Sequence, residues 1–179
     1  MLLHEHLENK LDKQPDFLFS EFQGKQITYR EANTLCNKLA HSLISAGLKK
    51  GDRFAFLSKN SSEMAFMYYA ASKVGIVPVP LNYRLADQEW EYIVNDSQSK
   101  IMIIRGNEYC ERIQKSRDNY KHIQNFIYIE SSKFGSDWIE FYDWISDQPD
   151  EKPQIDVSAE DDVYQMYTSG TTGHPKGAV

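Results

Sequence analysis

Glycines, hydroxyl side chains and one lysine are concentrated in a ten-residue string that runs from Thr168 to Gly177. Glycine permits backbone conformations that are closed to other residues, so successive N–H groups can converge on a phosphate oxygen. Threonine and serine add hydroxyl donors, and lysine adds a mobile positive charge that suits phosphate without demanding a fixed geometry. The string predicts a loop that holds a polyphosphate, and its candidate contacts are Thr168, Ser169, Gly170, Thr171, Thr172, Gly173, Lys176 and Gly177.

The string matches neither of two common phosphate-binding motifs. The pattern G-x-x-x-x-G-K-[ST] requires a glycine where Pro175 stands, and G-x-G-x-x-G is not met because Gly170 and Gly173 are three residues apart. An ordinary glycine-rich surface turn is the alternative interpretation, and the density of glycine and hydroxyl residues favours phosphate. The preceding run from Val163 to Tyr167 predicts a strand, whose carboxyl end is where open α/β sheets bind ligands.

The whole string resembles the signature loop of the adenylate-forming enzymes, a superfamily that contains acyl-CoA synthetases, firefly luciferase and the adenylation domains of nonribosomal peptide synthetases. Every position that the family pattern fixes is matched, and His174 falls where the pattern is open. Three further segments resemble the family's first half, and the last of them is more similar to acyl-CoA ligases than to peptide synthetases. These segments are Ile27 to Asn33, Gly47 to Arg53 and Gly75 to Leu85.

The resemblance implies an ATP-dependent acid–CoA ligase that activates a carboxylate as an acyl-adenylate and releases pyrophosphate. It implies ATP with Mg²⁺, coenzyme A and a small carboxylic acid as ligands, and a role in fatty acid metabolism. The family's catalytic lysine and acyl pocket lie in later segments, so the resemblance assigns no catalytic residue and no metal ligand to this chain. Three alternatives stay open: a non-catalytic remnant that binds a partner, a peptide-synthetase adenylation domain, and an independent nucleotide-binding module.

The resemblance also implies a domain organisation. Residues 1–26 form a lead-in, and residues 27–179 form a partial AMP-binding domain that ends inside the phosphate loop. Within that domain, residues 147–162 are acidic, contain two prolines and lack periodicity, so they read as a solvated surface connection. We therefore expect the chain to be inactive by itself and to need the missing C-terminal region of the same enzyme as its partner.

Predicted strands and helices alternate along the chain, which indicates an α/β fold with a mainly parallel sheet covered on both faces. Thr28 and Glu31 form a capping box that opens a helix whose apolar face contains Cys36, and Gly47 ends that helix. Ser61 or Ser62 caps a second helix that is apolar nearly all round and is expected to lie deep, and Asp87 caps a third. Strands are expected at residues 54–57, 76–81, 101–104 and 126–129. The resemblance implies that this is the N-terminal portion of the adenylate-forming enzyme fold, truncated at the phosphate loop.

Composition narrows the classes of partner. The net charge of −6 and the scattered basic residues argue against nucleic acid as a main partner. The most apolar region, residues 64–81, is interrupted by Lys73 and two prolines, so no membrane span is expected. Two distant cysteines and the absence of a signal-peptide pattern predict reduced thiols and a cytoplasmic protein.

Three smaller clusters are interpreted as structural. His4-Glu5-His6 could suggest a metal site, but adjacent ligands at an unstructured terminus are usually solvated. Asp161 and Asp162 precede the predicted loop strand and are expected to point to solvent. The aromatic residues from Trp138 to Trp144 have roughly helical spacing and are expected to pack in a core.

Overall fold

The computed structural model describes residues 1–131, 135–168 and 175–179. The chain divides into two compact units, and each is described by itself. The first unit contains Met1–Gly51, Asn60–Ile76 and Ile145–Val163, and the second contains Asp52–Lys59, Val77–Trp144 and Tyr164–Val179.

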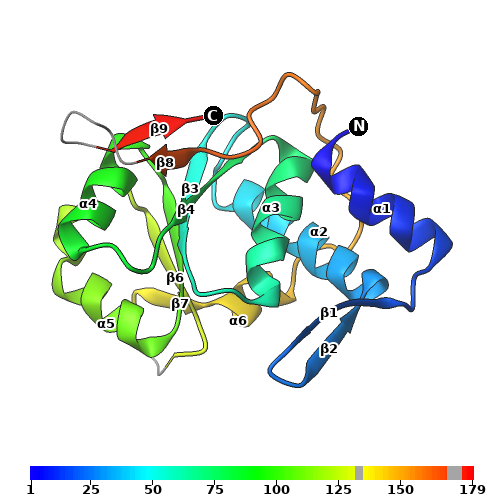
Figure 1. The fold of residues 1–179 in the computed structure, drawn as a ribbon, viewed down its shortest axis with the longest axis horizontal. Helices are drawn as coiled ribbons and strands as arrows, with labels where there is room; N and C mark the ends of the chain where they lie inside the picture. The colour runs from blue at the N-terminus through cyan, green and yellow to red at the C-terminus, as the bar shows by residue number, and fades with distance from the viewer. Residues whose placement is uncertain (132–134, 169–174) are drawn as a thin grey trace. The chain divides into compact units, whose positions relative to one another are not determined.

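The second unit is built on a five-stranded sheet in which every pair of neighbours is parallel, as the alternating pattern predicts. Helices α4 and α5 lie on the same face of this sheet (Figure 1). The strands in spatial order are β4 (Val77–Leu81), β3 (Arg53–Leu57), β5 (Ile101–Arg105), β6 (Asn125–Ile129) and β7 (Trp138–Glu140), and the helices are α4 (Asp87–Asp96), α5 (Asn107–Lys115), the 3₁₀ helix η1 (Arg117–Asn119) and α6 (Phe141–Ser146), which ends beyond this unit.

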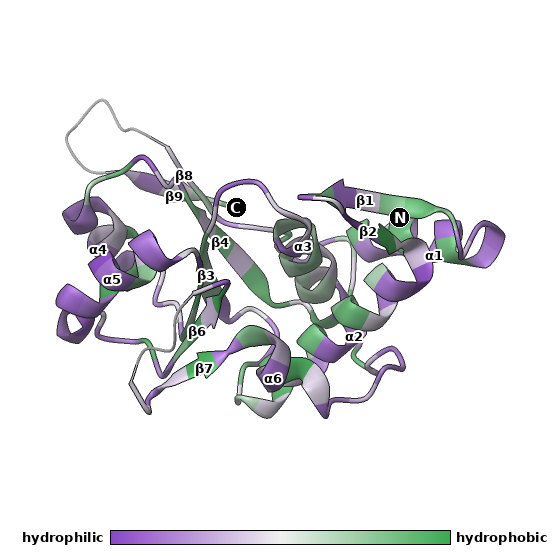
Figure 2. Cartoon of the chain, turned by 90° about the horizontal axis from the view of Figure 1, so that it is seen from below, coloured by the Kyte–Doolittle hydropathy of each residue, from purple (hydrophilic) through white to green (hydrophobic). Residues whose placement is uncertain are grey.

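Most residues of these strands are apolar, and green segments mark them in Figure 2. Every residue of β5 is buried. Alternate positions such as Ala55 and Met102 pack in one cluster with Trp90 of α4 and Ile113 of α5. A side chain that alternates onto the other face, such as Phe54, is also buried. A sheet buried on both faces explains why continuous apolar runs, without alternation, predicted these strands correctly.

The predicted strand at residues 163–167 is placed differently. Strand β8 (Met166–Thr168) begins three residues later and pairs antiparallel with β9 (Lys176–Ala178) in a separate two-stranded sheet. The neighbouring edge of the parallel sheet is β4, whose Pro78 and Pro80 have no N–H to donate to another strand. Only the Gln165 N–H reaches that edge among the described backbone bonds, donating to the Pro78 carbonyl at 3.0 Å.

The first unit contains three helices that lie side by side and a hairpin at one end of them (Figure 1). The capping box is confirmed, because Thr28 Oγ1 accepts from the Glu31 N–H and Glu31 accepts from the Thr28 N–H. Ser61 caps the next helix, and Gly75 ends it in the left-handed conformation. The elements are α1 (Leu3–Lys13), β1 (Leu18–Phe22), β2 (Lys25–Thr28), α2 (Tyr29–Ser45) and α3 (Ser62–Val74).

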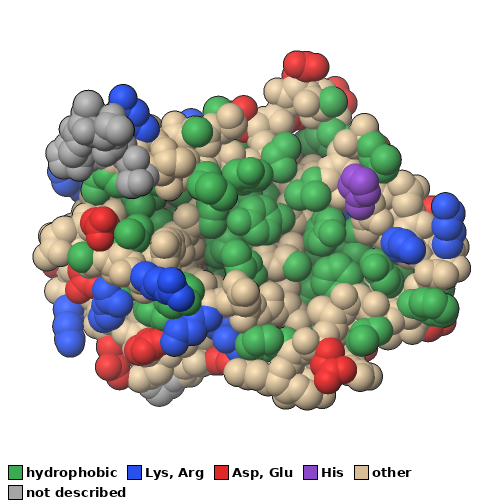
Figure 3. All heavy atoms as spheres, viewed as in Figure 1, with side chains coloured by type: hydrophobic (Ala, Val, Ile, Leu, Met, Phe, Trp, Pro, Cys, Tyr) green, Lys and Arg blue, Asp and Glu red, His purple; other side chains and the backbone are tan. Residues whose placement is uncertain are grey.

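Helix α3 does not lie as deep as its composition predicts. Phe66, Ala70 and Ala71 are fully buried, but Met64 and Tyr68 are only half-buried. Hydrophobic side chains gather over α3 and β1 on the face seen in Figure 3. The prediction was wrong because an apolar helix surface can be shared between a core and an uncovered face.

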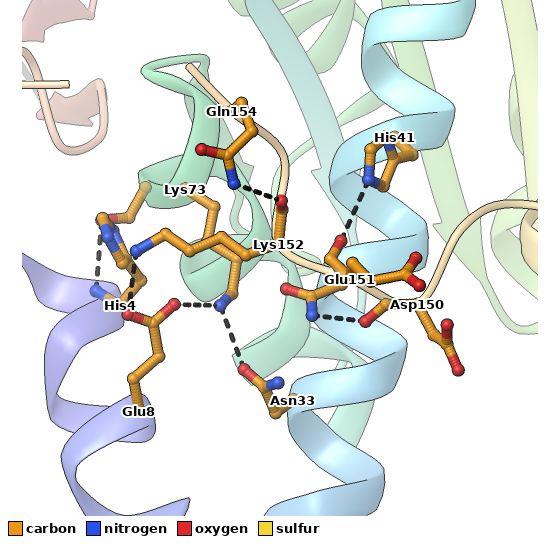
Figure 4. Close-up of polar contacts among 11 residues, drawn as sticks. His4, Glu8, Asn33, His41, Lys73, Asp150, Glu151, Lys152 and Gln154 are labelled. Atoms are coloured by element: carbon orange, nitrogen blue, oxygen red, sulfur yellow. Dashed lines mark hydrogen bonds and ion pairs between the residues drawn. The ribbon is translucent and has the colours of Figure 1, made fainter. Parts of the chain in front are cut away.

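Lys73, which interrupts the apolar sequence of α3, is completely buried. Its ammonium donates to Glu8 Oε1 of α1 at 2.5 Å and to Asn33 Oδ1 of α2 at 3.0 Å. Lys152 donates to the other Glu8 oxygen at 2.9 Å, so one carboxylate joins two lysines (Figure 4). Burial by itself would raise the pKa of Glu8, but the hydrogen bonds from the two lysines outweigh it and lower the pKa.

The N-terminal residues are a helix and not the unstructured terminus that the sequence suggested. His4 is buried, and both its N–H and its Nδ1 lie within hydrogen-bond distance of Ser72 Oγ, at 3.2 and 3.0 Å. Because the hydroxyl accepts from the backbone N–H, its own proton is available to Nδ1. Burial lowers the pKa of His4, and Lys152 and Lys73 lower it further against the opposing effect of Glu8.

The acidic connection at residues 147–162 has no helix or strand, as expected, but it is tied to the first unit. Asn37 donates to the Asp150 carbonyl at 2.6 Å, and His41 Nε2 donates to the Glu151 carbonyl at 3.0 Å (Figure 4). Asp161 does not simply point to solvent, because it pairs with Lys50 at 2.8 Å. These contacts use the backbone carbonyls of Asp150 and Glu151, which every residue type has, so the sequence could not predict them.

Two local predictions need correction. Ala86, not Asp87, is the N-cap of α4, because the Glu89 carboxylate reaches back to the Ala86 N–H at 2.8 Å and frees Asp87 for an ion pair with Arg112. The aromatic segment is split, since Trp138 begins β7 and only the residues from Phe141 on are helical.

Both cysteines are free and buried, as expected for small hydrophobic residues. Burial raises the pKa of Cys36 to about 12 and that of Cys110 to about 11, so both are thiols at neutral pH. Within the described ranges, no helix has both the length and the apolar character needed to cross a membrane.

Glu8→Ala is expected to lower the free energy of unfolding by about 3 kcal/mol, since it leaves the buried Lys73 ammonium without its carboxylate. Lys152→Ala removes the half-exposed partner of the same carboxylate and serves as the control, with an expected loss of about 1 kcal/mol or less. Urea unfolding at pH 7 measures both changes. Equal losses for the two variants would contradict a dominant role for the buried pair.

The stability of the protein is expected to fall as the pH drops below about 6.5, because the buried, neutral His4 must gain a proton that it binds readily only when unfolded. The stabilisation is complete above the unfolded pKa and is lost progressively toward the lowered folded pKa. His4→Gln should flatten the dependence of the urea midpoint between pH 5 and 6.5. The exposed neighbour on α1, changed by His6→Gln, should leave the wild-type slope in place.

Candidate phosphate-binding site

The ends of the predicted phosphate loop are joined by the β8–β9 ribbon. Thr168 is the last residue of β8 and stands opposite Lys176, the first residue of β9. Gly177 stands opposite Tyr167, and there is no register shift along the ribbon. The other candidate residues, Ser169, Gly170, Thr171, Thr172 and Gly173, lie outside the described residues.

The alternation of a strand sorts the ribbon into two faces. Residues that stand opposite one another in an antiparallel pair share a face, and the next pair along lies on the other face. Thr168 and Lys176 are therefore on one face, and both are exposed. Tyr167 and Gly177 are on the other, where Tyr167 is half-buried against the core cluster of the second unit.

Gly177 contributes a close approach between strands. A Cβ at this position would lie 2.4 Å from Gln165 Nε2 and 2.9 Å from Tyr167 Cζ, closer than real Cβ contacts. The sequence interpretation gave this glycine a role in the shape of the loop. The structure adds a steric reason that concerns the base of the loop, where the ring of Tyr167 lies across the opposite strand.

Tyr167 is held by polar contacts on both sides of its hydroxyl group. It donates to Asp96 Oδ2, in the last residue of α4, at 2.6 Å, and it lies 3.2 Å from Gln165 Nε2. Burial raises the pKa of Tyr167, and the hydrogen bond to Asp96 and its negative charge raise it further. The hydroxyl is therefore protonated at neutral pH and remains a donor.

Gln165 links the ribbon to the parallel sheet. Its side chain is nearly buried, and Oε1 accepts from Arg53 Nε of β3 at 3.3 Å. Sequence reasoning missed Gln165, Arg53 and Asp96, because none belongs to the glycine-rich string. The only available signal was the position of Tyr167 directly before Thr168.

A second polar cluster lies at the carboxyl ends of the strands of the parallel sheet. Lys59, just after β3, pairs with Glu108 at 2.9 Å. Its ammonium lies 5.8 Å from the ring centre of Tyr83, which follows β4, and 5.6 Å from that of Tyr109 in α5. The hydrogen bond to Glu108 raises the pKa of Lys59, and the same bond lowers the pKa of Glu108. No motif predicted this cluster, because its members come from two loops and from helix α5, which are far apart in the sequence.

The ribbon carries a hydroxyl donor on Thr168 and an ammonium on Lys176, and both groups suit phosphate oxygens. Across residues 1–131, 135–168 and 175–179, no three His, Cys, Asp or Glu side chains form a group that could hold a metal ion. The polar contacts at His4 connect it to Ser72 and not to His6.

Comparison with known sequences places these features in a family. The model of the AMP-binding enzyme family matches residues 7–179. The long-chain-fatty-acid–CoA ligase FadD13 of Mycobacterium tuberculosis is 35% identical over 156 residues, which cover 86% of this chain and 29% of that protein. A 3-oxocholest-4-en-26-oate–CoA ligase of Rhodococcus rhodochrous is 28% identical over 179 residues, covering 97% of this chain and 32% of that protein. The chain thus spans between 29% and 32% of the length of these two relatives.

Solved structures agree on the fold. The anthranilate CoA ligase AuaEII, in complex with anthranoyl-AMP, matches with a TM-score of 0.92 and 25% identity, over 99% of this chain and 34% of that chain. The inhibitor-bound N-terminal domain of FACL13 from Mycobacterium tuberculosis matches with a TM-score of 0.85 and 31% identity, over 98% of this chain and 43% of that chain. The fold is therefore that of the N-terminal domain of adenylate-forming enzymes.

Gly177→Ala is expected to loosen the ribbon, because the added methyl group must displace Gln165 or the Tyr167 ring. We expect a local loss of about 1–3 kcal/mol, the usual result of overpacking, seen as faster hydrogen exchange of the β8 and β9 amides by NMR. Ala178→Ser, at the next position of β9, is the control and should exchange like wild type. Wild-type protection in Gly177→Ala would show that the close approach does not constrain the ribbon.

Proposed function

Because this chain belongs to the AMP-binding enzyme family, we propose that it is the N-terminal part of an ATP-dependent acid–CoA ligase. The observation that carries the proposal is the glycine- and hydroxyl-rich string whose two ends, Thr168 and Lys176, stand opposite one another on an exposed face. The two relatives named above and the solved structure of AuaEII are CoA ligases by their own names. This favours a CoA ligase over a peptide-synthetase adenylation domain.

The proposed reaction has two steps. A carboxylate oxygen of the substrate forms a bond to the α-phosphorus of ATP as the bond to the bridging oxygen breaks, and pyrophosphate leaves with the electron pair. In the second step the sulfur of a thiol, which we propose is that of coenzyme A, forms a bond to the acyl carbon and loses its proton. The bond between that carbon and the phosphate oxygen breaks, and AMP leaves with the electron pair. Such a transfer depends mainly on positioning and on stabilisation of the charge that develops on the leaving group.

We assign the loop to the β- and γ-phosphates, which form the leaving group. Thr168 would donate through its hydroxyl, and Lys176 would place positive charge against the phosphate oxygens from the opposite strand. Ser169, Thr171 and Thr172 would add donors, while Gly170 and Gly173 would let the backbone approach. Gly177 would act indirectly, by allowing the base of the ribbon to close.

The remaining ligands are proposed without residues of this chain. Mg²⁺ would arrive with ATP and reduce the charge of its phosphates, and no side chain described here is assigned to it. The carboxylic acid, for which a fatty acid is one candidate, and coenzyme A would bind mainly to the rest of the enzyme. Cytoplasmic location remains a prediction from the sequence.

The 179-residue chain is expected to bind ATP weakly and to catalyse nothing by itself. Each charge-assisted hydrogen bond contributes roughly 1.5–3 kcal/mol, whereas ordering one loop residue opposes binding by roughly 1–2 kcal/mol of backbone entropy. The string supplies one lysine for a ligand with several negative charges. Millimolar affinity is therefore expected, and micromolar binding of ATP would contradict this view.

Lys176→Ala is expected to weaken pyrophosphate binding about threefold to tenfold, since one exposed cation is removed from the loop. Titration of ¹⁵N-labelled protein by NMR measures this, with shifts expected at the amides of Thr168, Lys176 and Gly177. Lys121→Ala, an exposed lysine elsewhere in the second unit, is the control and should bind like wild type. Shifts confined to other regions, or equal binding by all three proteins, would argue against the phosphate loop.

The ligase reaction itself is tested by exchange of segments. In FadD13, the 156-residue segment that matches this chain is replaced by this chain, and formation of acyl-CoA from a long-chain fatty acid is measured. ATP-dependent activity that falls in the Lys176→Ala form supports the proposal. A folded chimera that binds ATP but retains full activity after this substitution counts against it.

A further inference from the structure

One side chain touches both strands at the base of the loop. Tyr167 immediately precedes Thr168, and its ring lies against Gly177 of the opposite strand, where an added Cβ would lie 2.9 Å from Tyr167 Cζ. Tyr167 therefore contacts the chain just before the loop begins and just after it ends. Any movement of this ring would disturb both ends together.

The ring is anchored to the core of the second unit through Asp96. The hydroxyl of Tyr167 donates to Asp96 Oδ2 at 2.6 Å, a short distance typical of a carboxylate acceptor. Asp96 ends α4, and that helix is fixed by Trp90, Ile93 and Val94, which are buried in the cluster that covers the sheet. The base of the ribbon is thus connected to a packed helix and not only to its own strands.

The direction of each hydrogen bond is determined by the groups involved. The hydroxyl of Tyr167 gives its one proton to the Asp96 carboxylate, so it can only accept from Gln165 Nε2. With the amide nitrogen turned toward Tyr167, Gln165 Oε1 faces Arg53 Nε and accepts from it. The result is a chain of donors and acceptors that runs from β3 through the ribbon to the end of α4, in which each member has one consistent orientation.

From these contacts, we propose that Asp96 and Tyr167 are positioning residues that hold Thr168 and Lys176 opposite one another, so that both can act on a single pyrophosphate group. The proposal rests on the function proposed above. Side chains directly opposite in an antiparallel pair have Cβ atoms about 4.5–5.5 Å apart, which places a hydroxyl and an ammonium within reach of one ligand. Tyr167 and Asp96 lie on the other face of the ribbon and would act only through the strands.

The test uses the 179-residue protein with Tyr167→Phe, Asp96→Ala and Asp96→Asn. Tyr167→Phe keeps the ring and removes the hydroxyl, while Asp96→Ala removes the acceptor. Each is expected to speed hydrogen exchange of the β8 and β9 amides and to weaken pyrophosphate binding about fivefold, the value of one hydrogen bond. Because both changes remove the same bond, the double variant should be no weaker than either single variant.

Asp96→Asn is the conservative variant, since its amide oxygen can still accept from Tyr167. It should restore most of the exchange protection and most of the affinity, which a general loss of stability would not do. Asp118→Asn, an exposed carboxylate in η1, is the matched control and should behave like wild type. Urea midpoints of all variants, measured in parallel, should differ little from that of the control.

The outcomes separate the two proposals. Wild-type exchange rates in Tyr167→Phe and Asp96→Ala would overturn the positioning role, as would faster exchange with unchanged pyrophosphate affinity. Additive losses in the double variant would also overturn it, because the two residues would then act independently. If the wild-type protein does not bind pyrophosphate at millimolar concentration, the proposed function and the positioning role in it both fail.

Discussion

The close approach between Gly177 and the ring of Tyr167 is the contact on which the candidate site depends. It allows two strands of three residues to pair in one register, which strands so short do not ensure through their backbone bonds alone. A shift by one residue would bring a side chain against the ring and turn Lys176 toward the inner face. The steric requirement at Gly177 therefore determines which face of the ribbon carries the Thr168 hydroxyl and the Lys176 ammonium.

Side chains along a β-strand alternate between its two faces, so residues that pack and residues that could bind phosphate lie on opposite faces of the ribbon. On the face toward the core, the Tyr167 ring fills the space that Gly177 leaves open. On the exposed face, Thr168 and Lys176 carry groups that can bind an anion. A change at Tyr167 would therefore act on a ligand of the proposed site only through the backbone. This separation lets the base of the ribbon be held firmly by Asp96 and Gln165 while the outer side chains remain accessible to solvent.

Strands β3 to β6 of the parallel sheet could be predicted from the sequence because nearly all their residues are buried, so they read as continuous apolar runs. Strand β7 was not predicted, since only the first of its three residues is buried. The capping box at Thr28 and the helix end at Gly47 are also local, since their physical causes lie within a few residues. The antiparallel ribbon could not be predicted in the same way. Strand β8 has only three residues, and its partner lies on the far side of a glycine-rich string that looks like a turn.

The buried ion pair shows why other parts escaped prediction. Lys73 appeared to interrupt an apolar helix, and its partners Glu8 and Asn33 are 65 and 40 residues away in sequence. Nothing local distinguishes such a lysine from one on a solvated face, because its burial is decided by whether a distant carboxylate meets it. The string from Thr168 to Gly177 does not have this difficulty as a prediction, since the phosphate loop that we propose would draw its donors from consecutive residues.

Lys73 and Lys176 show how the surroundings of a lysine decide the role of its positive charge. Lys73 is buried in the first unit and paired with the carboxylate of Glu8, so loss of that partner would leave an unpaired buried charge. Lys176 is exposed, and an exposed ammonium on a flexible stem binds no single geometry by itself. For such a residue to favour one ligand, the selectivity must come from the backbone that carries it. In this chain, we propose, that backbone is held by a glycine opposite a tyrosine and by the carboxylate at the end of α4. The precision of the proposed site would then reside in residues that do not touch the ligand.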